Sequence, residues 1–215
     1  MAEDTQGYVG VKFNMERVKN KAPKDSRIEL LATWCQEFDR RGLAPPYDGG
    51  SYENLSLRVK MGHPEFIITA SKSRLSDSDT PEKFCLVYDV NFAEKKVYFS
   101  AVKPREPSSE SMVHALIYNM RPEVQYVFHG HCMEITRLCI KSRDQAEKLK
   151  ISVTEHEKPY GTLELVDEVR KVLKDNKHTN FIEMLNHGFL SFDETMDLAA
   201  LLPFGVKKQC IYLLE

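Results

Sequence analysis

Three histidines and one glutamate carry the most distinctive chemistry in this sequence. His129 and His131 are separated by a single glycine, Glu110 precedes them by the length of a short helix, and His187 lies much further along the chain. Three imidazole nitrogens with one open coordination position are the ligand set of a catalytic zinc site. If the four side chains converge, the protein is predicted to be an enzyme that uses a metal ion as a Lewis acid.

The His-Gly-His segment gains its meaning from the period of a β-strand. Side chains two residues apart on a strand lie on the same face, so His129 and His131 would both reach one ion. Gly130 between them leaves the opposite face open for close packing. A His-X-His segment alone also occurs as two surface histidines in a turn, and that alternative stays open without further ligands.

Glu110 begins a predicted helix behind Ser108 and Ser109. The first backbone N–H groups of a helix have no intrahelical partners and its dipole favours negative charge, so this position suits a carboxylate or a phosphate. The alternative is that one serine caps the helix and Glu110 belongs to an ordinary charged first turn.

His114 shares the helix face of Glu110 and is interpreted as a packed, hydrogen-bonded histidine rather than a ligand. Cys132 beside His131 is interpreted as a buried thiol.

The composition is that of one globular domain. The chain has 215 residues, 42% of them hydrophobic and 29% charged, with a net charge of -2. That charge does not favour nucleic acid or an anionic membrane, and the longest apolar run is too short to span a bilayer. The N-terminus lacks the pattern of a signal peptide. Five scattered cysteines indicate reduced thiols and a cytoplasmic protein.

The periodicity predicts an N-terminal arm over residues 1–25, loosely ordered, and a single domain over 26–215. Ser26 and Asp193 are expected to cap the first and last helices, Thr162 to cap another, and Pro203 to interrupt the last one. Strands are expected over 55–59, 66–70, 84–90, 96–101, 124–129, 181–185 and 189–192, with helices over 109–120, 135–140 and 163–173. This order favours an α+β or three-layer fold over a regular parallel sheet.

Several short segments together resemble the class II aldolase/adducin family, over most of the chain from about Ser26 to the last helix. The segments are Asn54-Leu55-Ser56-Leu57-Arg58, Ile67-Ile68-Thr69-Ala70-Ser71, Pro107 to Glu110 with His114 and Tyr118, Val127 to His131, Tyr160 to Leu165, and Asn186-His187-Gly188. No single segment is specific, but their order and spacing are.

The resemblance implies a three-layer α/β/α sandwich around a mainly antiparallel sheet, assembled as a homotetramer. It implies Zn²⁺, or another divalent metal, bound by His129, His131 and His187, with Glu110 as the acid/base residue. It also implies that a substrate phosphate is bound by residues that include Asn54, Ser71, Ser108 and Ser109.

The activity that the resemblance implies is that of a zinc-dependent aldolase-type lyase. Such an enzyme makes or breaks a C–C bond in a small phosphorylated hydroxy-carbonyl substrate through a metal-stabilised ene-diolate, as in carbohydrate metabolism. Epimerases of the family tend to carry Asp where this chain has Glu110. The alternatives are an epimerase, dehydratase or decarboxylase of the same family, or a non-catalytic adducin-like interaction module.

This chain departs from the family pattern at three places. Lys72 replaces a glycine at the phosphate segment, where its charge would either contribute to binding or block the pocket, and we include it among the phosphate-binding candidates. Glu53 replaces a small residue beside Asn54 and would repel a phosphate. The stretch between His131 and Gly161 is short and lacks the loop that carries the aldolase's catalytic tyrosine.

Overall fold

The computed structural model describes residues 13–215 except for 48–49, 52, 75 and 77–78. The helices of the described residues are α1 (Ile28–Arg40), α2 (Ser111–Met120), α3 (Met133–Lys141), α4 (Arg143–Lys148), α5 (Leu163–Asp175) and α6 (Met196–Leu214), with a 3-10 turn over Pro81–Lys83. The strands are β1 (Asn14–Lys19), β2 (Pro46–Tyr47), β3 (Gly50–Ser51), β4 (Asn54–Arg58), β5 (Phe66–Thr69), β6 (Phe84–Asn91), β7 (Lys96–Ser100), β8 (Tyr126–Gly130), β9 (Ser152–Val153), β10 (Phe181–Met184) and β11 (Gly188–Asp193).

One mixed sheet forms the centre of the molecule. Its strand order is β1-β7-β6-β5-β4-β8-β11-β10-β9, and β2 and β3 form a separate hairpin. The sheet is antiparallel throughout except at its edges, where β1 runs parallel to β7 and β9 runs parallel to β10. The predicted mainly antiparallel sheet is therefore confirmed, and β8 lies in its middle, between β4 and β11.

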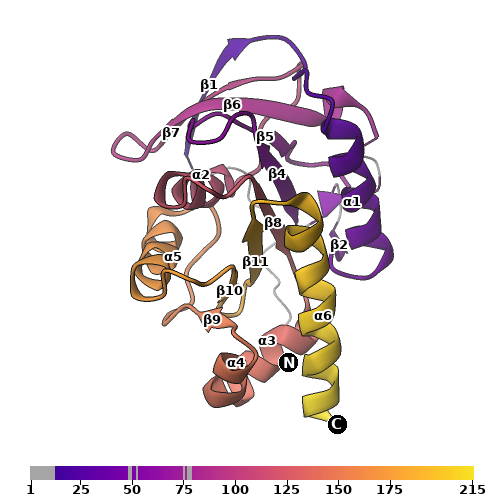
Figure 1. Ribbon diagram of the computed structural model, residues 1–215. Helices are drawn as coiled ribbons and strands as arrows, with labels where there is room; N and C mark the ends of the chain where they lie inside the picture. The colour runs from indigo at the N-terminus through magenta and orange to yellow at the C-terminus, as the bar shows by residue number, and fades with distance from the viewer. Residues whose placement is uncertain (1–12, 48–49, 52, 75, 77–78) are drawn as a thin grey trace.

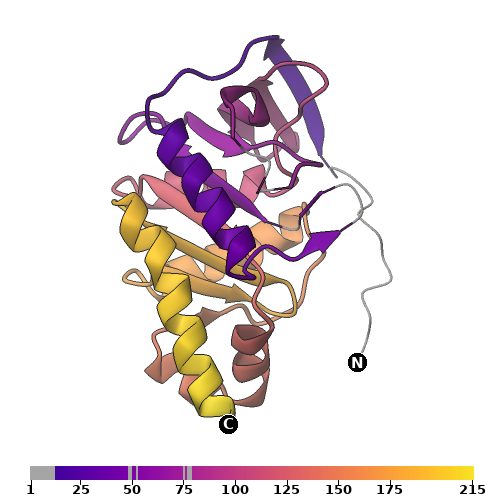
Figure 2. The ribbon, with the colours of Figure 1, turned by 90° about the vertical axis from the view of Figure 1, so that its right-hand side faces the viewer.

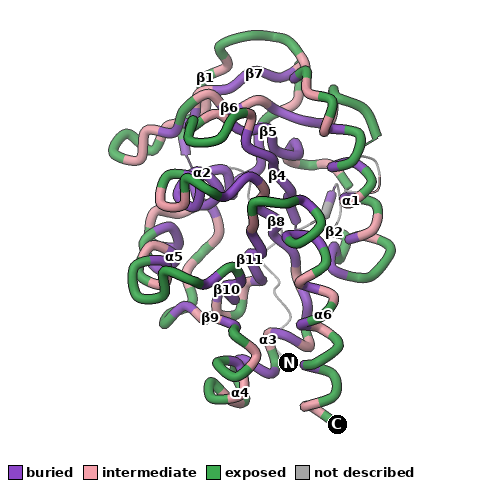
Figure 3. The backbone as a smooth tube through the Cα atoms, viewed as in Figure 1, coloured by how far each residue is buried: buried purple, intermediate pink, exposed green. Residues whose placement is uncertain are grey.

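Helices cover both faces of this sheet, as Figures 1 and 2 show. Met112 of α2 and Val166 of α5 belong to the hydrophobic core on one face, whereas Leu31 of α1 and Val206 of α6 belong to the core on the other. The central strands are buried and the outer faces of the helices are exposed (Figure 3). The α/β/α sandwich predicted from the sequence is confirmed: helices such as α1 and α5 bury one apolar stripe against the sheet, and α2 is buried on nearly all sides.

The N-terminal segment differs from its prediction. Residues 1–12 of the expected arm lie outside the described residues, but Asn14–Lys19 form an edge strand of the sheet rather than a loosely ordered arm. Arg17 also donates hydrogen bonds to the carbonyl oxygens of Ala101 and Arg105, both at 2.6 Å. Most side chains of β1 are partly or fully exposed, so the strand has no apolar alternation from which it could be predicted.

Three helix caps were predicted, and one of them is confirmed. Thr162 accepts a hydrogen bond from the N–H of Leu165 at 3.3 Å and caps α5. Ser26 does not cap α1, which begins after Arg27 without a side-chain cap. Asp193 does not cap α6, because that role falls to Thr195 two residues later. In both cases the helix begins one or two residues later than predicted, and a capping motif alone does not resolve so small a difference.

The last helix runs unbroken through Pro203, against the prediction of an interruption there. Residues 141–157, for which no helix or strand was predicted, contain α4 and β9. None of the described helices is both long and apolar enough to cross a membrane.

Candidate metal centre

The first two histidines lie where β8 ends. His129 is opposite Asn54 of β4 and Leu190 of β11, and its side chain is fully buried. His131 follows the strand, and its backbone N–H donates to the carbonyl oxygen of Leu43 at 3.0 Å. The Nε2 atoms of the two imidazoles are 3.1 Å apart, so both rings meet on one side, as the strand period predicted.

Two glycines allow the backbone to pack this closely. A Cβ atom on Gly188 would lie 2.6 Å from the carbonyl oxygen of Gly130 and 3.0 Å from Cε1 of His129. A Cβ atom on Gly130 would lie 2.6 Å from the ring of Phe189. A larger residue at position 188 would therefore crowd the imidazoles of His129 and His131, whereas one at position 130 would crowd Phe189 and the backbone of Leu43.

The third histidine reaches the site from the turn between β10 and β11. Asn186 has φ of 57°, in the left-handed region that asparagine tolerates better than most residues. The N–H of His187 then donates to the carbonyl oxygen of Met184 at 2.9 Å. The turn stacks the ring of His187 on that of His129, with centroids 5.2 Å apart. The convergence of the three histidines, on which the metal hypothesis depends, is therefore present.

Thr154, directly after β9, makes hydrogen bonds to β10 and to the start of this turn. Its N–H donates to the carbonyl oxygen of Glu183 at 3.0 Å, and its hydroxyl oxygen accepts from the N–H of Leu185 at 2.8 Å. Its own carbonyl oxygen accepts from Arg143 at 3.2 Å. Thr154 thus contacts β10 and the residue two positions before His187, which fixes the start of the turn.

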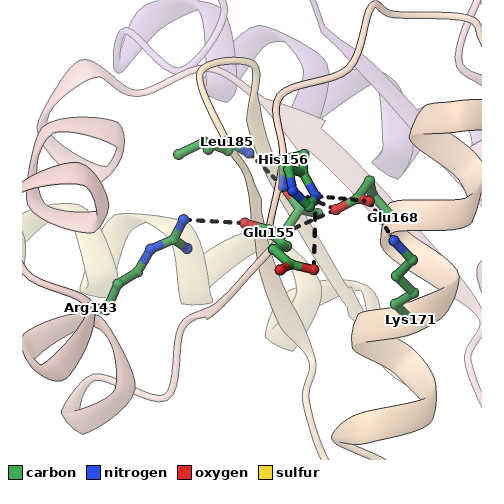
Figure 4. A network of polar contacts seen from close by, with 7 residues as sticks. Arg143, Glu155, His156, Glu168, Lys171 and Leu185 are labelled. Atoms are coloured by element: carbon green, nitrogen blue, oxygen red, sulfur yellow. Dashed lines mark hydrogen bonds and ion pairs between the residues drawn. The ribbon is translucent and has the colours of Figure 1, made fainter.

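Glu168 of α5 fixes the residues that follow Thr154 (Figure 4). Its carboxylate accepts from the backbone N–H groups of Glu155 and His156 at 3.2 and 3.0 Å and from Nζ of Lys171 at 2.8 Å. Burial alone would raise the pKa of Glu168, but these donors outweigh it and lower the pKa to about 2. The carboxylate is therefore ionised at neutral pH and ties this loop to α5.

The arrangement of the imidazoles fits a zinc ion. The ligand atoms of His129, His131 and His187 lie within 4.8 Å of one another. Zn–N bonds of about 2.0–2.1 Å in a tetrahedron place two nitrogens about 3.3 Å apart. Nδ1 of His129 is 2.9 Å from the carbonyl oxygen of Phe189, so it carries the proton and leaves the lone pair of Nε2 for a metal.

Glu110 lies directly beside these rings. It is 3% exposed at the start of α2, with Oε1 2.5 Å from Nε2 of His187 and Oε2 3.5 Å from Nε2 of His129. Burial alone would raise the pKa of its carboxyl, but the imidazoles of His129 and His187 outweigh burial and hold the pKa below its usual range. The predicted carboxylate and the three predicted histidines therefore form one cluster.

The predicted serines lie in the segment before α2. Ser108 and Ser109 are both buried, and the hydroxyl of Ser108 accepts from the N–H of Glu110 at 3.2 Å. Neither serine is the residue before the helix, since Glu110 occupies that position without a side-chain cap. The hydroxyl of Ser111 donates to the carbonyl oxygen of Ser108 at 2.7 Å, which tightens the turn.

The other phosphate-binding candidates lie nearby through backbone contacts. The N–H of Ser71 donates to the carbonyl oxygen of Glu106 at 2.8 Å, and Ala70 forms a bridge with Pro107. The loop after β5 therefore runs alongside the segment that leads into α2. Lys72 has φ of 54°, a conformation that favours glycine, and its side chain is exposed.

Asn54 completes the set of candidates on β4. It is 3% exposed, and its Oδ1 atom makes no hydrogen bond with the described residues. Glu53 beside it is also buried, so its carboxylate is not displayed to solvent. The structure thus places Asn54 opposite His129 of the metal cluster, whereas Ser71 contacts only the segment before α2, through its backbone, and Lys72 follows it with an exposed side chain.

A buried polar layer between β4 and α2 was not predicted as a unit. Ser56 of β4 lies 2.7 Å from Nδ1 of His114 and 2.7 Å from the hydroxyl of Tyr118. The prediction that His114 is packed and hydrogen-bonded is confirmed. Arg58 is 1% exposed and donates to the carbonyl oxygens of Tyr118, Arg121 and Pro122 at the end of α2. The sequence feature that could have indicated this layer is the polar residue at every second position of β4, namely Asn54, Ser56 and Arg58.

The cysteines behave as the sequence suggested. All five are free and buried in the structure. Cys132 is confirmed as a buried thiol, and its Sγ donates to Oε2 of Glu134 at 3.2 Å.

The fold and this site define a three-layer α/β protein with a histidine cluster of metal-binding type. Residues 29–210 match the sequence profile of the Class II Aldolase and Adducin N-terminal domain. The chain therefore belongs to the class II aldolase and adducin family, as its motifs indicated.

Two named relatives are similar over most of their length. The chain is 29% identical over 191 residues to "5-methylthioribulose-1-phosphate/5-deoxyribulose-1-phosphate aldolase" of Escherichia coli O45:K1 (strain S88 / ExPEC), covering 85% of this chain and 78% of the relative. It is 31% identical over 156 residues to "Methylthioribulose-1-phosphate dehydratase" of Cronobacter sakazakii (strain ATCC BAA-894), covering 71% and 68%.

Solved structures support the fold. A sugar-phosphate aldolase from Thermotoga maritima superimposes with a TM-score of 0.69 at 21% identity, covering 87% of this chain and 93% of that one. An L-fuculose 1-phosphate aldolase superimposes with a TM-score of 0.68 at 20% identity, covering 90% and 87%. At such identities the likeness establishes the architecture.

Proposed function

We propose that the protein is a metal-dependent lyase that removes water from a ketopentose phosphate of the 5-(methylthio)ribulose 1-phosphate type. The observation that carries the proposal is the convergence of three imidazoles on one buried carboxylate, Glu110, at the start of α2. The names of both relatives support the substrate class, because each contains this sugar phosphate.

The metal ligands in this proposal are His129, His131 and His187, and the imidazole donors suit zinc. When bound, the cation supplies positive charge beside the ketone and hydroxyl oxygens on which negative charge develops after a proton is removed. Near-stoichiometric zinc in the purified protein is the expected result. The adducin-like alternative predicts no bound metal.

Glu110 is the acid/base residue in this proposal. Its carboxylate takes the proton from carbon 3, next to the ketone. The electron pair of that C–H bond becomes the double bond between carbons 3 and 4 as the bond between carbon 4 and its hydroxyl oxygen breaks. Glu110 returns its proton to the departing hydroxyl, which leaves as water, and the remaining enol becomes a 2,3-diketone. One carboxylate beside adjacent carbons is sufficient for both transfers.

The phosphate group is assigned to the segment before α2. Ser108 and Ser109 lie at the N-terminal end of the helix, where anions are favoured, and Ser71 and Lys72 lie alongside. Asn54 faces the same cluster from β4. This placement sets the distance between phosphate and metal, and so determines which carbons lie beside Glu110.

Cleavage of the bond between carbons 3 and 4 is the second candidate reaction. The relative that covers more of this chain is named an aldolase, which favours it. In that reaction the proton leaves the hydroxyl of carbon 4, the C–C pair stays on carbon 3, and carbon 3 takes up a proton. The sequence has no tyrosine between His131 and Tyr160, where the aldolase-type tyrosine is expected, and this favours elimination.

The test is to identify the product formed by the zinc-loaded protein from 5-(methylthio)ribulose 1-phosphate. Elimination gives a diketone, which 1,2-diaminobenzene traps as a quinoxaline. Cleavage gives dihydroxyacetone phosphate, which an NADH-linked reductase detects. Glu110→Gln should lower turnover by at least about 100-fold while the zinc content stays unchanged. Absence of both products, or full activity of the glutamine variant, would refute the proposal.

The proposed assembly is a homotetramer, as the family resemblance implies. Sedimentation velocity of the zinc-loaded protein should give a single species of four chains. A protein that sediments only as a monomer would contradict the assembly and leave each site dependent on its own chain.

A further inference from the structure

Four buried polar side chains extend the candidate site into the layer between β4 and α2. Asn54 and Ser56 come from the strand and His114 and Tyr118 from the helix, and each is at most 3% exposed. Ser56 connects the strand to the two helix residues: its hydroxyl oxygen is 2.7 Å from Nδ1 of His114 and 2.7 Å from the hydroxyl of Tyr118.

These contacts favour one placement of the hydroxyl protons. Tyr118 has a short contact to Ser56 and a longer one, 3.5 Å, to the carbonyl oxygen of Gln125, so it donates to Ser56. Ser56 has a 2.7 Å contact to His114 and a 3.3 Å contact to the carbonyl oxygen of Val127, so it donates to His114. Nδ1 of His114 is then an acceptor.

The single proton of the imidazole therefore lies on the other nitrogen. Burial lowers the pKa of His114 to about 3, so the ring is neutral at physiological pH and has one N–H group. With Nδ1 accepting from Ser56, that group is Nε2–H. Nε2 of His114 is buried and makes no hydrogen bond with the described residues.

The carboxylate of Glu110 is the acceptor that suits this N–H group. His114 is four residues after Glu110 on the same face of the helix, and its backbone N–H donates to the carbonyl oxygen of Glu110 at 3.2 Å. Oε2 of Glu110 is also buried. Among the described residues, neither Nε2 of His114 nor Oε2 of Glu110 makes a hydrogen bond, and Oε2 has a 3.5 Å contact to Nε2 of His129. The two atoms are a donor and an acceptor of complementary kind, one helical turn apart.

When a metal is bound, the carboxylate of Glu110 loses a hydrogen-bond donor that it has in this structure. In the structure Nε2 of His187 lies 2.5 Å from Oε1 of Glu110. A ring nitrogen that ligates a metal has no proton to donate, so His187 cannot hold the carboxylate by that bond once it is a ligand. Glu110 then needs another donor within the buried layer.

We propose that His114 is a positioning residue, whose Nε2–H group, fixed by Ser56 and Tyr118, donates to the carboxylate of Glu110 in the metal-bound protein. The inference rests on the proposed roles of the histidine cluster and of Glu110. It assigns the polar residues of β4 and α2 to the orientation of the acid/base group, since a carboxylate must be aligned with the proton that it removes.

The first test is the tautomer of His114, measured by ¹⁵N NMR of histidine-labelled protein with and without zinc. Signals of His114 are assigned by their loss in His114→Gln, because the sequence has seven histidines. We expect a protonated Nε2 and an unprotonated Nδ1 in the zinc-loaded wild type. Ser56→Ala should increase the fraction of the other tautomer. A wild-type ring protonated at Nδ1 would overturn the inference, whether or not the protein is active.

The second test compares His114→Leu with His114→Gln in the product assay. Leucine removes the donor, whereas the amide of glutamine retains an N–H group near the position of Nε2. His114→Leu should lower kcat by about 10- to 100-fold, the usual effect of removing a partner of a catalytic group, with KM and zinc content unchanged. His114→Gln should recover most of the loss. Equal kcat for wild type and the leucine variant would overturn the inference.

The two tests separate this inference from the proposed function. If the wild type forms neither product, the proposed substrate and reaction fail, while the tautomer in zinc-loaded protein still decides the role of His114. If the leucine variant does not fold, the wild-type spectrum and the kcat of the glutamine variant decide it. A wild type that is active but has the opposite tautomer refutes only the positioning role.

Discussion

Replacing Glu183 by glutamine should make the folded protein more stable at alkaline pH. Glu183 of β10 is 1% exposed, and its Oε1 atom accepts from the hydroxyl of Thr136 at 2.6 Å. Its Oε2 atom makes no hydrogen bond with the described residues. Burial raises the pKa of this carboxyl to about 7, against the hydrogen bond from Thr136 and the charges of His187 and Arg143.

The sign and size of the effect follow from proton linkage. Below pH 4.5, the ordinary value of this group, both the folded and the unfolded protein hold the proton and stability does not depend on it. Between pH 4.5 and about 7 the unfolded chain has lost the proton while the folded protein keeps it, so stability falls as pH rises. At 1.36 kcal/mol per pH unit this loss amounts to about 3 kcal/mol. Glutamine stays neutral and still accepts from Thr136, so the variant avoids the loss.

Urea unfolding of wild type and Glu183→Gln, from pH 4.5 to 8 in a metal chelator, measures this difference. The two proteins should be equally stable at pH 4.5, and the variant should be more stable by about 3 kcal/mol at pH 8. Glu168→Gln is the matched control, because the pKa of Glu168 is lowered and its ionised form stabilises the fold. That control should be less stable than wild type at pH 8. A pH-independent difference between Glu183→Gln and wild type would refute the reasoning.

Three further variants test how the metal centre is held. His129→Ala should abolish stoichiometric zinc binding, measured by metal analysis, and retention of one zinc per chain would contradict its role as a ligand. Gly188→Ala should lower zinc affinity at least about 10-fold in chelator competition, because its Cβ atom would lie 2.6 Å from the carbonyl oxygen of Gly130. Gly205→Ala is the control: nothing lies within 4 Å of its Cβ atom, so zinc affinity should be unchanged. Thr154→Val should destabilise the protein by about 1 kcal/mol in urea unfolding, since it removes the acceptor of the partly buried N–H of Leu185, and Thr154→Ser should restore most of that loss. Equal effects of valine and serine would argue against the hydrogen bond.

The sequence was informative where its periodicity is local. The two-residue period of a strand predicted that His129 and His131 lie on one side, and their Nε2 atoms are 3.1 Å apart although His131 follows the end of β8. The helix of Glu110 was equally clear from its apolar stripe. The position of His187 could not be derived from spacing, because it depends on a turn between strands far along the chain. Only the order of motifs, through the family resemblance, connected it to the others.

The incorrect predictions, for β1, two helix caps and Pro203, have one physical cause. Each depends on contacts with residues distant in the sequence, which a local sequence pattern does not contain. β1 was missed because its hydrogen bonds come from β7, which is more than 70 residues away, while its side chains stay mostly exposed. The caps at Ser26 and Asp193 were misplaced because several polar residues near a helix start are chemically suitable and tertiary packing chooses among them. Pro203 lies inside an unbroken α6 for a related reason, since packing against the sheet overrides a local preference.

The polar residues of β4 show why pattern alone does not disclose a role. Asn54, Ser56 and Arg58 alternate with leucines, which is the pattern of a strand with one face in water. In the structure all three are buried. Ser56 makes hydrogen bonds to His114 and Tyr118 of α2, and Arg58 donates to the carbonyl oxygens at the C-terminal end of that helix. The alternation was correct about the strand and misleading about the environment of its polar face.

That environment also determines where Glu110 lies. A helix of 10 residues is stiff, so Arg58 at its C-terminal end and the hydroxyl contact between Ser56 and Tyr118 fix both its register and its rotation against β4. The residue before its first turn is then placed over His129, which pairs with β4 through Asn54. One strand therefore sets the positions of both the acid/base candidate and a metal-ligand candidate, and we expect the geometry between them to persist when the surrounding loops differ.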